Sequence, residues 1–183
     1  MDPAAMRKSL EAMTEELRRN PDAGHVRPRV VTSLIDGVHS RSDFVQYGTQ
    51  FSFESDESVD RAGEGSAPSP LRYFLSGIAF CLQVWHVKGA AVAGCDVDDL
   101  EIEVSTYMDM RGEHRIDDIP PHPQWVAVET RVASPSPSDR VLAMSDEAFA
   151  RCPVSALVAR AVPLHRRLVH NGIVISDTVP EAP

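Results

Sequence analysis

The chain has 183 residues, of which 43% are hydrophobic and 25% charged, as in an ordinary globular domain. Its formal net charge of −9 argues against nucleic-acid binding, which needs a basic face. No apolar stretch opens the sequence, so we expect no signal peptide and a cytoplasmic protein. The 3 cysteines are too widely spaced for a disulfide framework or a zinc pattern. Two of them could still form a transient, catalytic disulfide in a reducing compartment.

The first third of the chain changes from helical to strand-like patterning. Apolar residues at helical spacing predict an amphipathic surface helix over residues 3–19. Three β-like runs follow at residues 26–35, 42–47 and 50–54. Asp36-Gly37 separates the first two runs and is typical of a hairpin turn.

A long uncharged run between Pro70 and Gly94 predicts the central element. Ser69 suits a helix N-cap, Pro70 the first helical position, and Gly94 the C-terminal stop. The run is apolar nearly all round, which is typical of a buried helix, and its few basic residues argue against a membrane span. Residues 55–67, just before it, are acidic and Gly-rich, so we expect a mobile surface loop there.

The remaining segments complete an α+β pattern. Alternating residues predict strands at 100–106 and 125–133, and a further strand is expected at 168–175. Two helices separated at Pro153 lie between the last two strands. We therefore expect antiparallel sheets packed on a long buried central helix. Residues 1–20 are interpreted as an N-terminal helical extension and residues 21–183 as a single domain.

Two cysteines stand in settings that suggest chemistry. Cys81 lies in the middle of the central helix, and Cys152 lies beside Pro153 at the start of another, where main-chain N–H groups stabilise a thiolate. The alternative is that both thiols simply pack as small apolar groups. Cys95 follows Gly94 in a turn and is expected to be a semi-exposed thiol without a role. The histidines are scattered without ligand spacing, so we expect neither a metal nor a cofactor.

These residues together resemble a known family. The sequence Gly65-Ser66-Ala67-Pro68-Ser69-Pro70, a buried helix carrying Cys81, and the motif Cys152-Pro153-Val154-Ser155 are similar to the OsmC/Ohr family. The resemblance covers roughly residues 26–175. It implies an OsmC-like fold in an intertwined homodimer, with two equivalent sites at the dimer interface.

The resemblance also implies a thiol-dependent peroxidase that reduces organic hydroperoxides. Cys81 would attack the peroxide and become a sulfenic acid, Cys152 would resolve it as a disulfide, and an external thiol or dithiol would restore the pair. The substrate would be a small apolar molecule. Arg41 could stand in for an arginine that the family's peroxidases carry near the first hairpin. Leu71 occupies the position of a glutamate that works with that arginine in those enzymes.

Two other functions fit the same sequence. Because Leu71 cannot position an arginine, the Cys81 nucleophile could instead serve hydrolysis or acyl transfer. The other possibility is a non-catalytic dimeric module that binds small molecules in an apolar cleft, where Cys81 only packs. Reactivity of Cys81 towards an alkylating reagent near neutral pH separates the last reading from the others.

Overall fold

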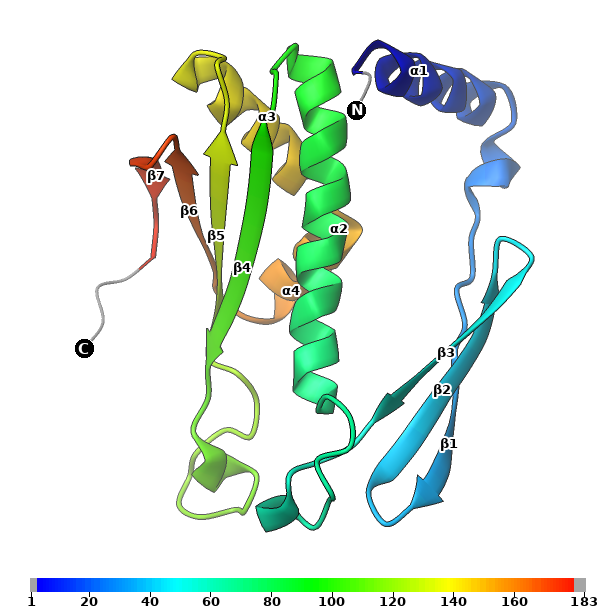
Figure 1. Cartoon of the computed structure of the whole chain (residues 1–183), viewed down its shortest axis with the longest axis vertical. Coiled ribbons are helices and arrows are strands. Elements are labelled where there is room, and N and C mark those ends of the chain that lie inside the picture. The colour runs from blue at the N-terminus through cyan, green and yellow to red at the C-terminus, as the bar shows by residue number, and fades with distance from the viewer. Residues whose placement is uncertain (1–2, 180–183) are drawn as a thin grey trace. The chain divides into compact units, whose positions relative to one another are not determined.

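The computed structural model describes residues 3–179. The chain divides into two compact units, one formed by residues 15–75 and the other by Met1–Thr14 together with Ser76–Pro183. The helices α1 (Pro3–Arg19) and α2 (Pro70–Ala93) each contain residues of both units. Figure 1 labels the elements in chain order.

The smaller unit contains a three-stranded antiparallel sheet. Strands β1 (Val31–Asp36), β2 (His39–Gln46) and β3 (Thr49–Ser55) pair in this order. The predicted hairpin between β1 and β2 is confirmed, and Gly37 adopts the left-handed conformation with φ 54°. Short 3-10 helices at Pro21–Gly24 and Val59–Arg61 flank the sheet.

A buried carboxylate organises the loop between β3 and α2. Asp56 is only 2% exposed and accepts hydrogen bonds from the main-chain N–H groups of Glu57, Glu64 and Ser66. The Ser66 hydroxyl also donates to it, at 2.9 Å. These bonds, led by the Ser66 main chain, hold the pKa of Asp56 well below its usual range. The segment predicted as a mobile loop is therefore built around an internal anion.

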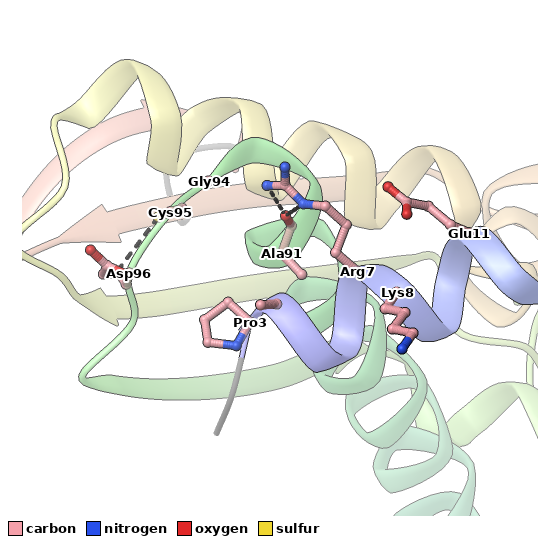
Figure 2. A pocket seen from close by; sticks show the side chains of 9 residues that line it. Pro3, Arg7, Lys8, Glu11, Ala91, Gly94, Cys95 and Asp96 are labelled. Carbon is pink, nitrogen blue, oxygen red and sulfur yellow. Dashed lines mark hydrogen bonds between the residues drawn. The ribbon is translucent and has the colours of Figure 1, made fainter.

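Helix α1 meets the C-terminal end of α2 through one arginine. The Arg7 guanidinium donates two hydrogen bonds to the Ala91 carbonyl, at 2.9 and 2.5 Å, and so satisfies one of the free carbonyls that end a helix. Figure 2 shows this contact beside a cavity of about 370 Å³, which Lys8, Glu11 and Cys95 also line. The predicted helix at residues 3–19 is confirmed, and none of its residues is buried.

Helix α2 begins and ends where the sequence predicts. The Ser69 carbonyl accepts the first helical hydrogen bonds, from Arg72 and Tyr73, and Gly94 ends the helix with φ 63°. By length and composition α2 could cross a membrane, with a mean hydropathy of 1.2 over its most apolar window. Its side chains Ile78 and Leu82 are 0% exposed, as in the core helix of a soluble fold.

The larger unit contains a four-stranded sheet in the order β4 (Asp99–Tyr107), β5 (Trp125–Ala133), β6 (Leu164–His170) and β7 (Ile173–Asp177). A 3-10 helix, Met110–Gly112, lies in the connection from β4 to β5. Strands β5 and β6 are parallel because α3 (Ser138–Arg151) and α4 (Pro153–Ala161) form the crossover between them, while the other pairs are antiparallel. The α+β fold class is confirmed. The single strand predicted at 168–175 is instead a hairpin, which turns at Asn171 and Gly172.

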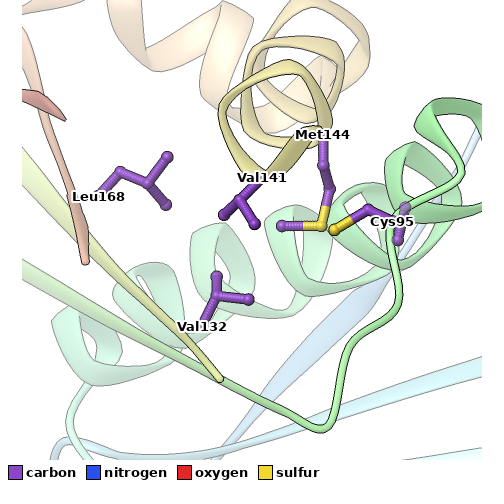
Figure 3. Close-up of a cluster of buried hydrophobic side chains, with 6 residues drawn as sticks. Cys95, Val132, Val141, Met144 and Leu168 are labelled. Atoms are coloured by element: carbon purple, nitrogen blue, oxygen red, sulfur yellow. The ribbon is translucent and has the colours of Figure 1, made fainter. Parts of the chain in front are cut away.

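The core of this unit joins α2, α3 and the sheet. Figure 3 shows Val132, Val141, Met144 and Leu168 converging from β5, α3 and β6. Cys95 belongs to the same cluster and is 2% exposed, so the prediction of a semi-exposed thiol is wrong. The reason is the turn at Gly94, after which the Cys95 N–H bonds to the Ala90 carbonyl at 3.0 Å. This bond folds the chain back under the end of α2.

Helix α2 also buries a histidine. His86 is 0% exposed, and its Nδ1–H donates to the Leu82 carbonyl at 2.9 Å. Among the described residues, its Nε2 has no hydrogen-bond partner, and its ring stands edge-on to Phe149. Burial is the main cause that lowers the pKa of His86 from 6.5 to about 4, and the nearby Arg166 charge adds to it. His86 is therefore neutral in the folded protein near pH 7.

We predict that this histidine makes the protein acid-sensitive. His86 takes up a proton near pH 6.5 in the unfolded chain but only near pH 4 in the folded chain. Its contribution to the free energy of unfolding is therefore fully present above pH 6.5 and is lost as the pH falls from 6.5 to 4. The total loss is about 3 kcal/mol. Urea unfolding at pH 7.5, 5.5 and 4.5 should show this fall in the wild type and a flatter profile in His86→Gln. The exposed His122→Gln is the control, and an unchanged slope in His86→Gln would contradict the prediction.

Candidate functional site

The candidate site begins with the position of Cys81 on α2. Its chain neighbours Ile78 and Leu82 are fully buried and fix the helix against the rest of its unit. Cys81 itself is partly buried. The helix thus holds the thiol rigidly, at a position that solvent still reaches.

Cys152 is placed by the break between α3 and α4. Pro153 has no N–H to offer and therefore starts α4, while Cys152 ends α3 and occupies the N-cap of α4. The Ser155 N–H donates to the Cys152 sulfur at 3.4 Å, as it would to a capping oxygen. The Cys152 side chain is 0% exposed.

The two sulfurs are in direct contact. The Sγ atoms of Cys81 and Cys152 are 3.1 Å apart, although 71 residues separate them in the sequence. Both cysteines are free thiols in the structure. A disulfide needs a separation of about 2.05 Å, so a shift of about 1 Å would join them. The arrangement can therefore take up and release two electrons without a large movement of the fold.

The surroundings of Cys81 favour the neutral thiol. Burial is the largest cause, and the hydrogen bond with Cys152 adds to it; together they raise the pKa of Cys81 from 9.0 to about 11. A hydrogen bond from the main chain of Val154, in the first turn of α4, and the charge of Lys88 act in the opposite direction. Burial and the second thiol outweigh these two groups.

Two other residues named from the sequence belong to the smaller unit. Arg41 lies on β2, where its guanidinium bonds to Asp43 at 3.2 Å and to the Ser52 hydroxyl at 3.1 Å. Leu71 lies half-buried in the first turn of α2. The structure thus brings Cys81 and Cys152 together, and a role for Arg41 stays a prediction. Within residues 3–179, no group of His, Cys, Asp and Glu residues could hold a metal ion.

Sequence reasoning placed main-chain N–H donors at the helix start beside Cys152, but it did not identify the residues that supply them or their effect on Cys81. Val154 and Ser155 act through their N–H groups, so their side chains carry no signal of this role. The one available signal was Pro153, because a proline directly after a cysteine indicates that the cysteine caps a helix. The contact between Lys88 and the Trp85 ring was also missed, although its spacing on the helix could have suggested it.

The protein is thus an α+β protein with a dithiol site, in which one free thiol lies on a core helix and the other lies at the N-terminus of a second helix. The model of the OsmC-like protein family matches residues 63–165, which contain both thiols and make up more than half of the chain. The chain therefore belongs to the OsmC-like protein family.

Solved structures of similar fold carry names from this family. An OsmC-like protein from Mycoplasma pneumoniae is 15% identical, with a TM-score of 0.62 over 79% of this chain and 99% of that one. An organic hydroperoxide resistance protein, OsmC, from Legionella pneumophila is 16% identical, with a TM-score of 0.57 over 79% and 99%. An organic hydroperoxide resistance protein from Elizabethkingia anophelis is 12% identical, with a TM-score of 0.58 over 80% of this chain and 99% of that one. At these identities the likeness shows the fold alone. No curated protein matches the sequence.

We predict that Cys81 reacts slowly but measurably at neutral pH and faster in base, so that only the absence of labelling across the whole pH range would favour the reading in which Cys81 merely packs. With a pKa of about 11, on the order of one thiol in ten thousand is ionised at pH 7, so the alkylation rate should rise about tenfold per pH unit. Iodoacetamide labelling of the reduced protein, followed on the Cys81 peptide by mass spectrometry, measures this rate. Cys152→Ala removes a group that raises the pKa and should react faster at pH 8. A rate that levels off below pH 8.5 in the wild type would contradict the prediction.

Proposed function

We propose that this protein is a thiol-dependent peroxidase that reduces organic hydroperoxides through Cys81 and Cys152. The observation that carries the proposal is the 3.1 Å separation of the two sulfurs. Membership of the OsmC-like family supports it, as do the similar structures named organic hydroperoxide resistance proteins. Cys81 is the attacking thiol because it is the partly exposed member of the pair.

The chemistry balances with a hydroperoxide as oxidant and a dithiol as reductant. The Cys81 thiolate attacks the outer peroxide oxygen and the O–O bond breaks, so the sulfur becomes a sulfenic acid and the alkoxide leaves as an alcohol after taking a proton. The Cys152 sulfur then attacks the sulfenic sulfur, a disulfide forms, and water leaves. An external dithiol reduces the disulfide by thiol–disulfide exchange.

Helix α4 has a role in the second step. A thiol must lose its proton to attack the sulfenic sulfur, and the Ser155 N–H already points at the Cys152 sulfur. The same helix start directs the Val154 main chain at Cys81. One helix N-terminus therefore stabilises negative charge on whichever sulfur is ionised at each stage.

Exposed apolar side chains support an apolar substrate. Phe80 precedes Cys81 on α2 and is 71% exposed, and Leu157 on α4 is 70% exposed. Val84 lies one turn after Cys81 on the same helix and is also exposed. A hydroperoxide with a hydrocarbon body would bury surface against these side chains, whereas hydrogen peroxide would not.

We further propose that the working protein is an intertwined homodimer in the cytoplasm. In the smaller unit, every residue of β1 is exposed, and large apolar side chains such as Leu34, Val45 and Phe51 face solvent. Exposed apolar surface on this scale marks an interaction surface. A second copy of the chain would cover it and could supply Arg41 to the thiol site.

We predict that hydroperoxide reduction depends on both thiols at the site and not on the third. With a dithiol as reductant, the wild type should consume cumene hydroperoxide, and Cys81→Ser should lose this activity by at least a hundredfold. Cys152→Ala should oxidise once and then stall. Cys95→Ser is the matched control and should keep the wild-type rate. Activity that survives in Cys81→Ser would refute the proposal. Thioester formation with an acyl electrophile, without peroxide turnover, would favour hydrolysis or acyl transfer instead.

We predict a dimer of twice the chain mass of 20.1 kDa by light scattering on a sizing column. Leu34→Glu places a charge in the apolar surface of β1 and should weaken dimerisation by roughly tenfold or more. Leu142→Glu is the matched control, because it makes the same change at an exposed position on α3, outside the three-stranded sheet. A monomeric wild type at micromolar concentration would contradict the dimer.

A further inference from the structure

Cys81, Trp85 and Lys88 lie on one face of α2. Trp85 follows Cys81 by four residues and Lys88 follows Trp85 by three, which are the spacings of neighbours on a helix surface. Helical side chains also lean towards the N-terminus of the helix. The long Lys88 side chain is therefore directed back over Trp85, towards Cys81.

The Trp85 ring holds the lysine in this direction. The Lys88 Nζ atom lies 4.5 Å from the centre of the Trp85 ring, within the range of a cation–π contact. Within residues 3–179, Lys88 has no carboxylate partner that would neutralise it. Both side chains are half-buried, so solvent screens the ammonium charge less than at a free surface.

Two arginines on neighbouring elements are paired with carboxylates. Arg151 precedes Cys152, but its Nε bonds to Glu147 at 2.5 Å. Arg166 stacks on the Phe149 ring and bonds to Asp146 at 2.7 Å. The Lys88 charge lowers the pKa of Cys81, in opposition to burial and the Cys152 thiol.

We propose that Lys88, held over the Trp85 ring, is the cation that stabilises the Cys81 thiolate in this protein. It acts from the same helix as the thiol and needs no residue from the smaller unit or from a second copy. Helix α2 itself supplies the positive charge through Lys88. The inference rests on the proposed function, and it assigns Lys88 and Trp85 as positioning residues for the reactive sulfur.

The rate of Cys81 alkylation tests this assignment without any peroxide. A unit charge that acts on a half-buried thiol changes the thiolate fraction roughly three- to tenfold. Lys88→Met should therefore slow iodoacetamide labelling of the Cys81 peptide by this factor at pH 8 and shift its pH profile upwards. Lys88→Arg keeps the charge and should stay within about twofold of the wild type. Trp85→Leu frees the lysine and should give an intermediate rate.

The matched control is Lys8→Met, which removes the same charge from α1. It should leave the Cys81 rate unchanged. Raising the salt concentration from 0.05 to 1 M should slow wild-type labelling towards the Lys88→Met rate, because salt screens the ammonium. This salt series needs no variant, so it still tests whether a positive charge stabilises the Cys81 thiolate if a variant fails to fold.

Several results would overturn the assignment. They are a Lys88→Met rate equal to the wild type, a Lys88→Arg rate as low as that of Lys88→Met, or wild-type labelling that is insensitive to salt. None of these results depends on peroxide turnover. Loss of hydroperoxide reduction with intact charge-dependent labelling would instead count against the proposed function and leave the role of Lys88 standing.

Discussion

The contact between the sulfurs of Cys81 and Cys152 is the constraint on which the site depends. It requires α2 to stay rigid, and the packing of Ile78 and Leu82 keeps it so. It also requires the chain to break its helix at Pro153, so that Cys152 becomes the cap of α4. The 3.1 Å separation of the two sulfurs therefore depends on how the central helix packs against the crossover between β5 and β6.

The electrostatics of this contact set its chemistry. Burial and the neighbouring thiol favour the protonated form of Cys81, which protects it from indiscriminate reaction. The start of α4 and the ammonium of Lys88 oppose that preference. A buried pair with few donors is a slow nucleophile but a stable disulfide partner, so binding of an apolar peroxide would have to contribute much of the specificity.

The sequence predicted those parts of the structure that depend on short-range signals. Proline and glycine fixed the ends of α2 and the start of α4, and periodicity predicted most of the elements. The burial of Cys95 could not be foreseen, since it depends on Val132 and Met144, which are distant in the sequence. Asp56 looked like surface charge because most of its donors are main-chain groups. The sulfur contact itself followed from family resemblance, as periodicity alone made Cys81 a core residue.

The most direct test of the redox pair is a peptide map of the wild-type protein under non-reducing conditions. Fully reduced protein would be mixed with one equivalent of tert-butyl hydroperoxide, blocked, digested and analysed by mass spectrometry. We expect one dominant new species, a Cys81–Cys152 cross-linked peptide, with Cys95 still a free thiol. Recovery of Cys81 and Cys152 as unmodified thiols, or a disulfide that includes Cys95, would contradict it.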